Sequence, residues 1–340
     1  MRSLDQEALA GPDRQAEGRR GDRVALHFEG GIGDTRSLTF AELGEEVARA
    51  AAALRGLGVG PGDRVGIYLP VIPEALVAVL ACARVGAVPA SVFGLFAGGR
   101  PVVPGLRDLA AEVVITADGS FRPGPPAQAD GVHRHGTPVA LKPAVDEALA
   151  GNPLVRHVLV VRRTGGPVPW QAGRDLWWHE CVERAEGGPG GPLPYPGGRR
   201  DDHRELGLRP GADVYWCAGE VGWLGGRPFG VFGALAAGVT QVLCESSPAV
   251  ARRSRLWEIV DRYGVTFLHT DPATVQALLS WSEELADRYD LSSLRALCRL
   301  TGPDPGQVRV MHRIRDWSGR ARAWESCRHP VPVAARAQRP

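Results

Sequence analysis

Residues 39–93 alternate helix-spaced apolar positions with short unbroken apolar runs, and this alternation constrains the fold more than any other feature of the sequence. Thr39 and Glu42 form a T-x-x-E capping box, which predicts a helix over about 40–56. The run at 65–69 is typical of a buried strand. A second apolar helix and a second such strand follow. This succession predicts an α/β fold with parallel sheets covered by helices.

The same two patterns return in the rest of the chain. Further strands are predicted at 112–116, 158–161, 214–217, 239–244 and 265–269, and further helices at 175–184, 229–237, 255–263 and 273–281. Between about 97 and 135 the pattern is weaker, and GSFRPGPPAQAD at 119–130 is interpreted as a loop insertion.

Composition divides the chain into five parts. They are a polar N-terminal segment at 1–36, a first α/β subdomain at 37–185, an irregular linker at 186–211, a second α/β part at 212–305 and a basic, frayed tail at 306–340. The linker is dense in glycine, proline and charge, so it buries too little apolar surface to offset the entropy of ordering it. We therefore expect residues 186–208 to be exposed and irregular.

Charge and cysteine usage narrow the class of protein. The 40 basic and 38 acidic residues give a net charge of +2 without long blocks of one sign, which disfavours nucleic-acid and membrane partners. The N-terminus has no apolar signal region, and the six cysteines form no C-x-x-C pair. We expect a cytoplasmic protein with reduced cysteines. Lys142 is the only lysine, so any mechanism that needs an amine has one candidate.

Four segments carry a family resemblance. Residues 37–96, beginning SLTFAELGEEV and ending SVFGLF, resemble the opening of AMP-forming acetyl-CoA and propionyl-CoA synthetases almost residue for residue. LKPAVDEAL at 141–149 and VLVVRRTGGPVPWQAGRDLWWHECVE at 158–183 are similar to the same family, as is ADVYWCAGEVGWLGG with the residues that follow it in 212–245. The resemblance spans about 37–305 and implies an incomplete N-terminal domain of an adenylate-forming enzyme.

The resemblance implies substrates and site residues. This family joins a short-chain carboxylate to CoA through an acyl-adenylate, in a reaction that consumes ATP and needs magnesium. Trp223-Leu224-Gly225 matches the Trp-Val-Thr of the acyl pocket, although simple core packing of Trp223 is an equal alternative. Arg134 matches the first of two arginines at the CoA entrance. The histidines on either side of Arg134 have no third ligand nearby in the sequence, so no metal site is predicted.

The sequence departs from the family where ATP is held. In place of a Ser/Thr-rich, lysine-containing phosphate loop it reads PLPYPGGRRDDHREL at 192–206, which is either a solvated loop or a divergent site built on Arg199 and Arg200. The family's G-E-P adenine turn is matched by Gly302-Pro303-Asp304, where proline removes a backbone donor.

The sequence also bears on the lysine that this family uses for adenylation. The family's C-terminal domain and its lysine would lie beyond Pro340, and Lys142 lies on the wrong segment to replace that lysine. Catalytic residues therefore stay unassigned, and unaided adenylation is not expected. Two readings are open, an impaired or partner-dependent ligase and a non-catalytic remnant that binds or merely folds. No G-x-S-x-G or G-x-G-x-x-G motif points to a hydrolase or a dinucleotide enzyme, and the oligomeric state is open.

Overall fold

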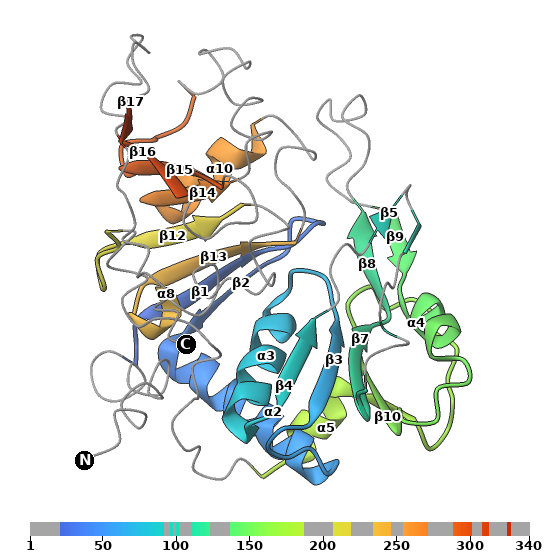
Figure 1. The fold of residues 1–340 in the computed structure, drawn as a ribbon. Helices are drawn as coiled ribbons and strands as arrows, with labels where there is room; N and C mark the ends of the chain where they lie inside the picture. The colour runs from blue at the N-terminus through green and yellow to red at the C-terminus, as the bar shows by residue number, and fades with distance from the viewer. Residues whose placement is uncertain are drawn as a thin grey trace, which may run out of the picture.

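Two large sheets with helices between them form the framework of the molecule (Figure 1). The computed structural model describes residues 21–91, 96–97, 100–101, 106, 110–122, 137–186, 207–218, 234–245, 254–270, 288–300, 308–312 and 325–327. The α/β class with parallel sheets, predicted from the alternation of helices and strands, is confirmed.

The first sheet has five parallel strands in the order β11-β10-β7-β3-β4. Their bounds are β3 Arg64–Tyr68, β4 Val88–Ser91, β7 Val113–Ala117, β10 His157–Val161 and β11 Asp175–Trp177. The central strand β7 is buried throughout, as expected for a parallel strand covered on both faces.

The second sheet has eight strands in the order β17-β16-β15-β14-β12-β13-β1-β2. Their bounds are β1 Val24–Glu29, β2 Thr35–Thr39, β12 Val214–Cys217, β13 Thr240–Cys244, β14 Phe267–Thr270, β15 Ala296–Leu300, β16 Val308–His312 and β17 Glu325–Cys327. The strands from β1 to β15 in this order pair in parallel, while β2, β16 and β17 run antiparallel to their neighbours at the two edges.

Two short antiparallel pairs stand apart from the large sheets. They are β5 Phe96–Ala97 with β6 Arg100–Pro101, and β8 Gly119–Arg122 with β9 Thr137–Ala140. The ribbon of β8 and β9 begins directly after β7 and leads into α4.

The helices are α2 Phe40–Gly56, α3 Pro73–Val85, α4 Lys142–Leu149, α5 Trp178–Arg184, α8 Ala234–Ala236 and α10 Arg255–Tyr263. The predicted capping box is present at the start of α2: Thr39 Oγ1 accepts from the N–H of Glu42, and the Glu42 carboxylate accepts from the N–H of Thr39. At the end of α3, Gly86 has a φ of 77°, the left-handed conformation that glycine adopts without strain.

One apolar core joins the two sheets through the helices. It contains Leu26 and Leu243 from the second sheet, Leu43 from α2, Leu76 from α3 and Ile67 from the first sheet. The helices α2 and α3 are therefore packed between the sheets, whereas α4 lies on the other side of the first sheet (Figure 1).

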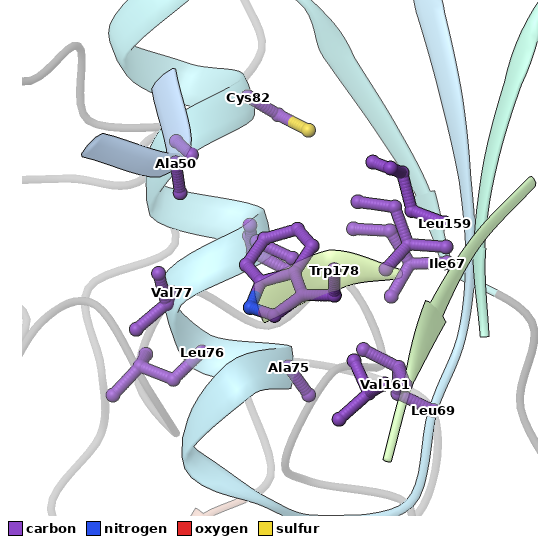
Figure 2. Packing of buried hydrophobic residues seen from close by; sticks show 14 of the residues in the cluster. Ala50, Ile67, Leu69, Ala75, Leu76, Val77, Cys82, Leu159, Val161 and Trp178 are labelled. Carbon is purple, nitrogen blue, oxygen red and sulfur yellow. The ribbon is translucent and has the colours of Figure 1, made fainter. Parts of the chain in front are cut away.

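Trp178 lies in the part of this core that belongs to the first sheet. Figure 2 shows its ring between α3 residues such as Ala75 and strand residues such as Ile67 and Leu159. Its side chain is buried although it starts the short helix α5, and this contact anchors α5 against the sheet.

The structure differs from the sequence expectations at several strands. Residues 24–29, assigned to a polar segment, form β1; residues 119–122, assigned to a loop, form β8; residues 175–177, assigned to a helix, form β11. Residues 308–312, assigned to a basic tail, form β16.

These strands share a physical reason for being missed. These segments form strands because they pair with strands distant in sequence and because their charges are compensated. A local sequence pattern records neither feature. At the end of β1, Glu29 is buried because Arg255, Arg262 and the hydroxyl of Tyr263 donate to its carboxylate. At the start of β11, Asp175 is buried beside Lys142.

Candidate functional site

The predicted site residues follow strands whose geometry is described. Trp223, Leu224, Gly225, Arg134, Gly302 and Asp304 lie outside the described residues, as does most of 186–208. At the end of that segment Leu208 is buried against the second sheet, in contrast to the exposure expected there.

The strands before the predicted acyl and adenine residues lie on either side of one strand, β14. In sequence, β12 precedes Trp223 and β15 precedes Gly302. Both strands pair in parallel with β14, so the three carboxyl ends lie along one edge of the second sheet. Ligands of open α/β sheets bind outside this edge, which makes it the candidate site of this chain.

Buried polar groups lie on β12 and β14 at this edge. The hydroxyl of Tyr215 lies 2.9 Å from Nδ1 of His269, and both side chains are buried. At the last residue of β14, the Thr270 hydroxyl is buried and has no hydrogen-bond partner within the described part of the chain. Thr270 is therefore a polar group at the sheet edge that sequence reasoning did not single out.

A charged junction connects the carboxyl edges of the two sheets. The guanidinium of Arg163, two residues after β10, donates to Asp34 at 2.8 and 3.0 Å and to Glu245. Asp34 lies between β1 and β2, and Glu245 follows β13. Burial alone would lower the pKa of Arg163, but the hydrogen bonds that it donates to Glu245 and Asp34 raise the pKa above its ordinary value.

Asp118 fixes the chain on the first-sheet side of this junction. It follows β7, and its buried carboxylate accepts from the backbone N–H groups of Gly119, Arg163, Thr164 and Gly165 at 2.6 to 3.2 Å. A Cβ at Gly119 would lie 2.7 Å from the Thr164 hydroxyl, so the close approach requires glycine.

The chemistry of this junction suits the positioning of chain segments and not the binding of a ligand. The Arg163 charge is already compensated by two carboxylates, and its guanidinium lies 4.9 Å from the Phe121 ring of β8. It therefore ties three elements together at the edge where ligands of this fold class bind. Nothing in the local sequence distinguishes Arg163 from Arg162, so this role could not be predicted.

The only lysine of the chain is part of a second charged cluster. Lys142 is fully buried, and its Nζ donates to Asp175 at 2.7 Å and to both oxygens of Asp146 at 2.8 and 2.9 Å. Arg174 also donates to both aspartates. Burial would raise the pKa of Asp175, but hydrogen bonds from Arg174, from the Gln171 N–H and from Lys142 lower the pKa below its ordinary value.

Metal ligands, membrane spans and cysteines can be assessed for the described residues alone. Within them, no group of three or more His, Cys, Asp or Glu side chains is arranged to hold a metal ion. No helix among them is long and apolar enough to cross a membrane. Cys82, Cys181, Cys217 and Cys244 are free thiols, and burial raises the pKa of Cys82 to about 12.

Comparison with known proteins decides the family. The sequence matches the family of AMP-binding enzymes over residues 12–188 and 198–326. This chain belongs to that family. The resemblance stated from the sequence segments is thereby confirmed, and the matched residues include strands β1 to β16 and the first two residues of β17.

Relatives of this AMP-binding enzyme are acetyl-CoA synthetases. The chain is 41% identical to the acetyl-coenzyme A synthetase of Streptomyces avermitilis and 43% identical to that of Streptomyces coelicolor, with 88% of the chain aligned in each case. It spans about half of those relatives, 48% of their length. This coverage agrees with the sequence expectation of a partial N-terminal domain.

A solved structure supports the same assignment of fold. The acetoacetyl-CoA synthetase from Streptomyces lividans superposes with a TM-score of 0.69 at 29% identity, covering 86% of this chain and 46% of that protein. The chain therefore has the architecture of part of an acyl-CoA synthetase.

Proposed function

We propose that this AMP-binding enzyme retains part of the acyl and CoA sites of a short-chain acyl-CoA synthetase, and that residues 1–340 do not form an acyl-adenylate by themselves. The proposal treats Trp223, Leu224 and Gly225 as the acyl pocket and Arg134 as a CoA ligand. Acetyl-CoA synthetases among the relatives support the choice of a short carboxylate and CoA. Cytoplasmic location is part of the proposal, since ATP and CoA are cytoplasmic substrates.

The observation that carries the second half of the proposal is the burial of Lys142. Adenylation develops negative charge on phosphate, and a cationic group placed there typically contributes about 3 to 4 kcal/mol to lowering the barrier. The chain has one lysine, and its amine is held by two carboxylates in a fully buried position. Moving it to a phosphate would leave the buried Asp175 with Arg174 as its remaining cationic partner.

The phosphate-loop segment also supports the proposal that residues 1–340 do not form an acyl-adenylate by themselves. Between residues 192 and 206 there is no serine, threonine or lysine, so the hydroxyl and amine donors that hold phosphates in this family have no counterpart. The arginines of that segment are Arg199, Arg200 and Arg204, and Gly197-Gly198 is followed directly by Arg199 and Arg200. An arginine-based phosphate site at these two residues is the alternative to a solvated loop.

Calorimetry with CoA tests the binding half of the proposal. We expect CoA to bind the wild-type chain and Arg134→Ala to weaken binding about tenfold at low salt, because an arginine–phosphate bond is charge-assisted. Arg156→Ala is the matched control, since it removes an equal charge from an exposed pair with Glu112. Unchanged affinity in Arg134→Ala would remove the CoA role of Arg134. No CoA binding by the wild type would favour a non-catalytic remnant that merely folds.

A further inference from the structure

A pocket on the α4 side of the first sheet is separate from the candidate site at the strand ends. It has a volume of about 450 Å³ and is lined by side chains that include Asp146, Leu149, Val155, Trp170, Gln171 and Arg174. It lies between the C-terminal turn of α4 and the loop that leads into β11. Its size falls in the range of about 300 to 1,000 Å³ that is usual for small-molecule pockets.

Trp170 gives this pocket an exposed aromatic wall. Its side chain is among the few large apolar ones exposed in the described residues, with 42% of its surface accessible. The ring nevertheless has a fixed neighbour, because it packs against Trp177 with 4.7 Å between ring centroids. The Arg162 guanidinium lies 4.6 Å from the Trp177 ring centroid. Trp170 is thus held in place while a large part of its surface stays open.

The loop that carries Trp170 is fixed by buried hydrogen bonds. The Asp175 carboxylate accepts from the backbone N–H of Gln171 at 2.9 Å, and Lys142 Nζ lies 3.4 Å from the carbonyl oxygen of Pro169. Both Lys142 and Asp175 have fully buried side chains. Two anchors on either side of Trp170 therefore form the pocket before any ligand arrives, which lowers the entropic cost of binding.

The charges around the pocket cancel. Lys142 and Arg174 supply two positive charges, and Asp146 and Asp175 supply two negative charges, with each cation bonded to both anions. Among the residues that line the pocket, no uncompensated charge is left to select an anion or a cation. The apolar wall of Leu149, Val155 and Trp170 favours a ring, and the Gln171 amide and Asp146 carboxylate supply polar partners for its edge.

We infer that this pocket binds a neutral, planar heteroaromatic ring that stacks on Trp170. A purine base is the simplest test ligand of that class, because its faces stack and its edge carries both donors and acceptors. The inference rests on the pocket alone and does not depend on the acyl or CoA sites.

Fluorine NMR of the 5-fluorotryptophan-labelled chain with adenine as the probe tests this site. The chain has nine tryptophans, and Trp170→Phe identifies the Trp170 resonance by its absence. We expect adenine to shift the Trp170 and Trp177 resonances in a saturable way and to leave Trp216 and Trp257, in the core of the second sheet, unchanged. Trp170→Ala should weaken adenine binding between about fivefold and a hundredfold, the loss expected for one stacked base.

Two controls decide between this site and others. Leu154→Ala removes another exposed apolar side chain near the pocket and should leave the affinity unchanged. Adenine bound at the nucleotide site of the family would shift other tryptophans and would survive Trp170→Ala, and that result would overturn the inference. A stronger response of Trp170 to tetramethylammonium or to inorganic phosphate than to adenine would also overturn it, because the charge balance excludes both ions.

Discussion

Lys142 is held in the structure by contacts that suit a structural role. Its amine bonds two carboxylates and approaches a backbone carbonyl, so three segments of the chain meet at one buried cation. Buried ion pairs gain little over apolar packing, but removing one partner leaves a buried charge without compensation. The lysine therefore matters for folding even where it takes no part in chemistry.

Lys142→Met tests this role. We expect the free energy of unfolding, measured by urea titration, to fall by about 3 to 5 kcal/mol, because Asp175 then stays buried with one partner fewer. Arg184→Met, which breaks an exposed pair with Glu180, should change it by less than about 1 kcal/mol. Equal stability of Lys142→Met and wild type would show that the cluster does not stabilise the fold.

Asp213 predicts a pH dependence of stability. Burial would raise its pKa, but hydrogen bonds from Arg295, Arg209 and Thr266 lower the pKa to about 2. The folded-state pKa of Asp213 lies below its unfolded value, which is near 4. Asp213 therefore stabilises the folded protein at pH values above about 4, and this contribution is lost as the pH falls through 2. The contribution amounts to about 2 kcal/mol.

Acid titration of Asp213→Asn measures this contribution. Between pH 4 and pH 2 the variant should lose less stability than the wild type, by roughly 2 kcal/mol over the window. Glu112→Gln is the control, since its carboxylate is exposed and paired with an exposed arginine. Parallel pH profiles for wild type and Asp213→Asn would contradict the hydrogen-bonded role of Asp213.

Like α10, the helix α2 begins at the residue predicted for it. Its capping box and apolar spacing are local features, and local features persist in the folded chain. Strands β3, β7, β10, β12 and β13 were predicted within a residue or two for the same reason, since each is a compact apolar run. By contrast, β1 and β11 contain buried carboxylates that only distant arginine or lysine partners make tolerable.

Thr39→Ala tests the capping box. The variant loses the bond that the N–H of Glu42 donates to Thr39 Oγ1, and its free energy of unfolding should fall by about 1 kcal/mol. Thr35→Ala, an exposed residue at the start of the same strand β2, is the control and should cost a few tenths of that amount. If both variants shift the urea midpoint equally, the cap contributes nothing beyond strand propensity.

At the scale of the whole molecule, Arg163 connects two sheets that already share an apolar core. The predicted ligand-binding segments follow strands of both sheets, so the angle between the sheets determines how these segments meet. The ligand-binding segments could be identified from the sequence because they resemble a family. The junction could not, because its four residues, Asp34, Asp118, Arg163 and Glu245, are spread over more than 200 positions. Such a contact has no local signature.

Arg163→Met should loosen the two sheets relative to each other. Glu245, whose side chain is fully buried, would lose its cation, so we expect a loss of about 3 to 5 kcal/mol. Hydrogen exchange read by mass spectrometry should rise in peptides covering β1, β2 and β13. Arg156→Met is the matched control, because Arg156 directly precedes β10 and its ion pair with Glu112 is exposed. Exchange that is equal in the two variants would contradict the junction.

The central claim is that residues 1–340 of this AMP-binding enzyme do not adenylate a carboxylate by themselves. The most direct test is acetate- or propionate-dependent exchange of labelled pyrophosphate into ATP at saturating magnesium, with the acetyl-coenzyme A synthetase of Streptomyces coelicolor as the positive control. We predict exchange no greater than in a reaction without protein, because the only lysine is buried and the phosphate-loop segment has no serine, threonine or lysine. Clear exchange that Trp223→Ala abolishes would contradict the claim and would point to Arg199 and Arg200 as a phosphate site.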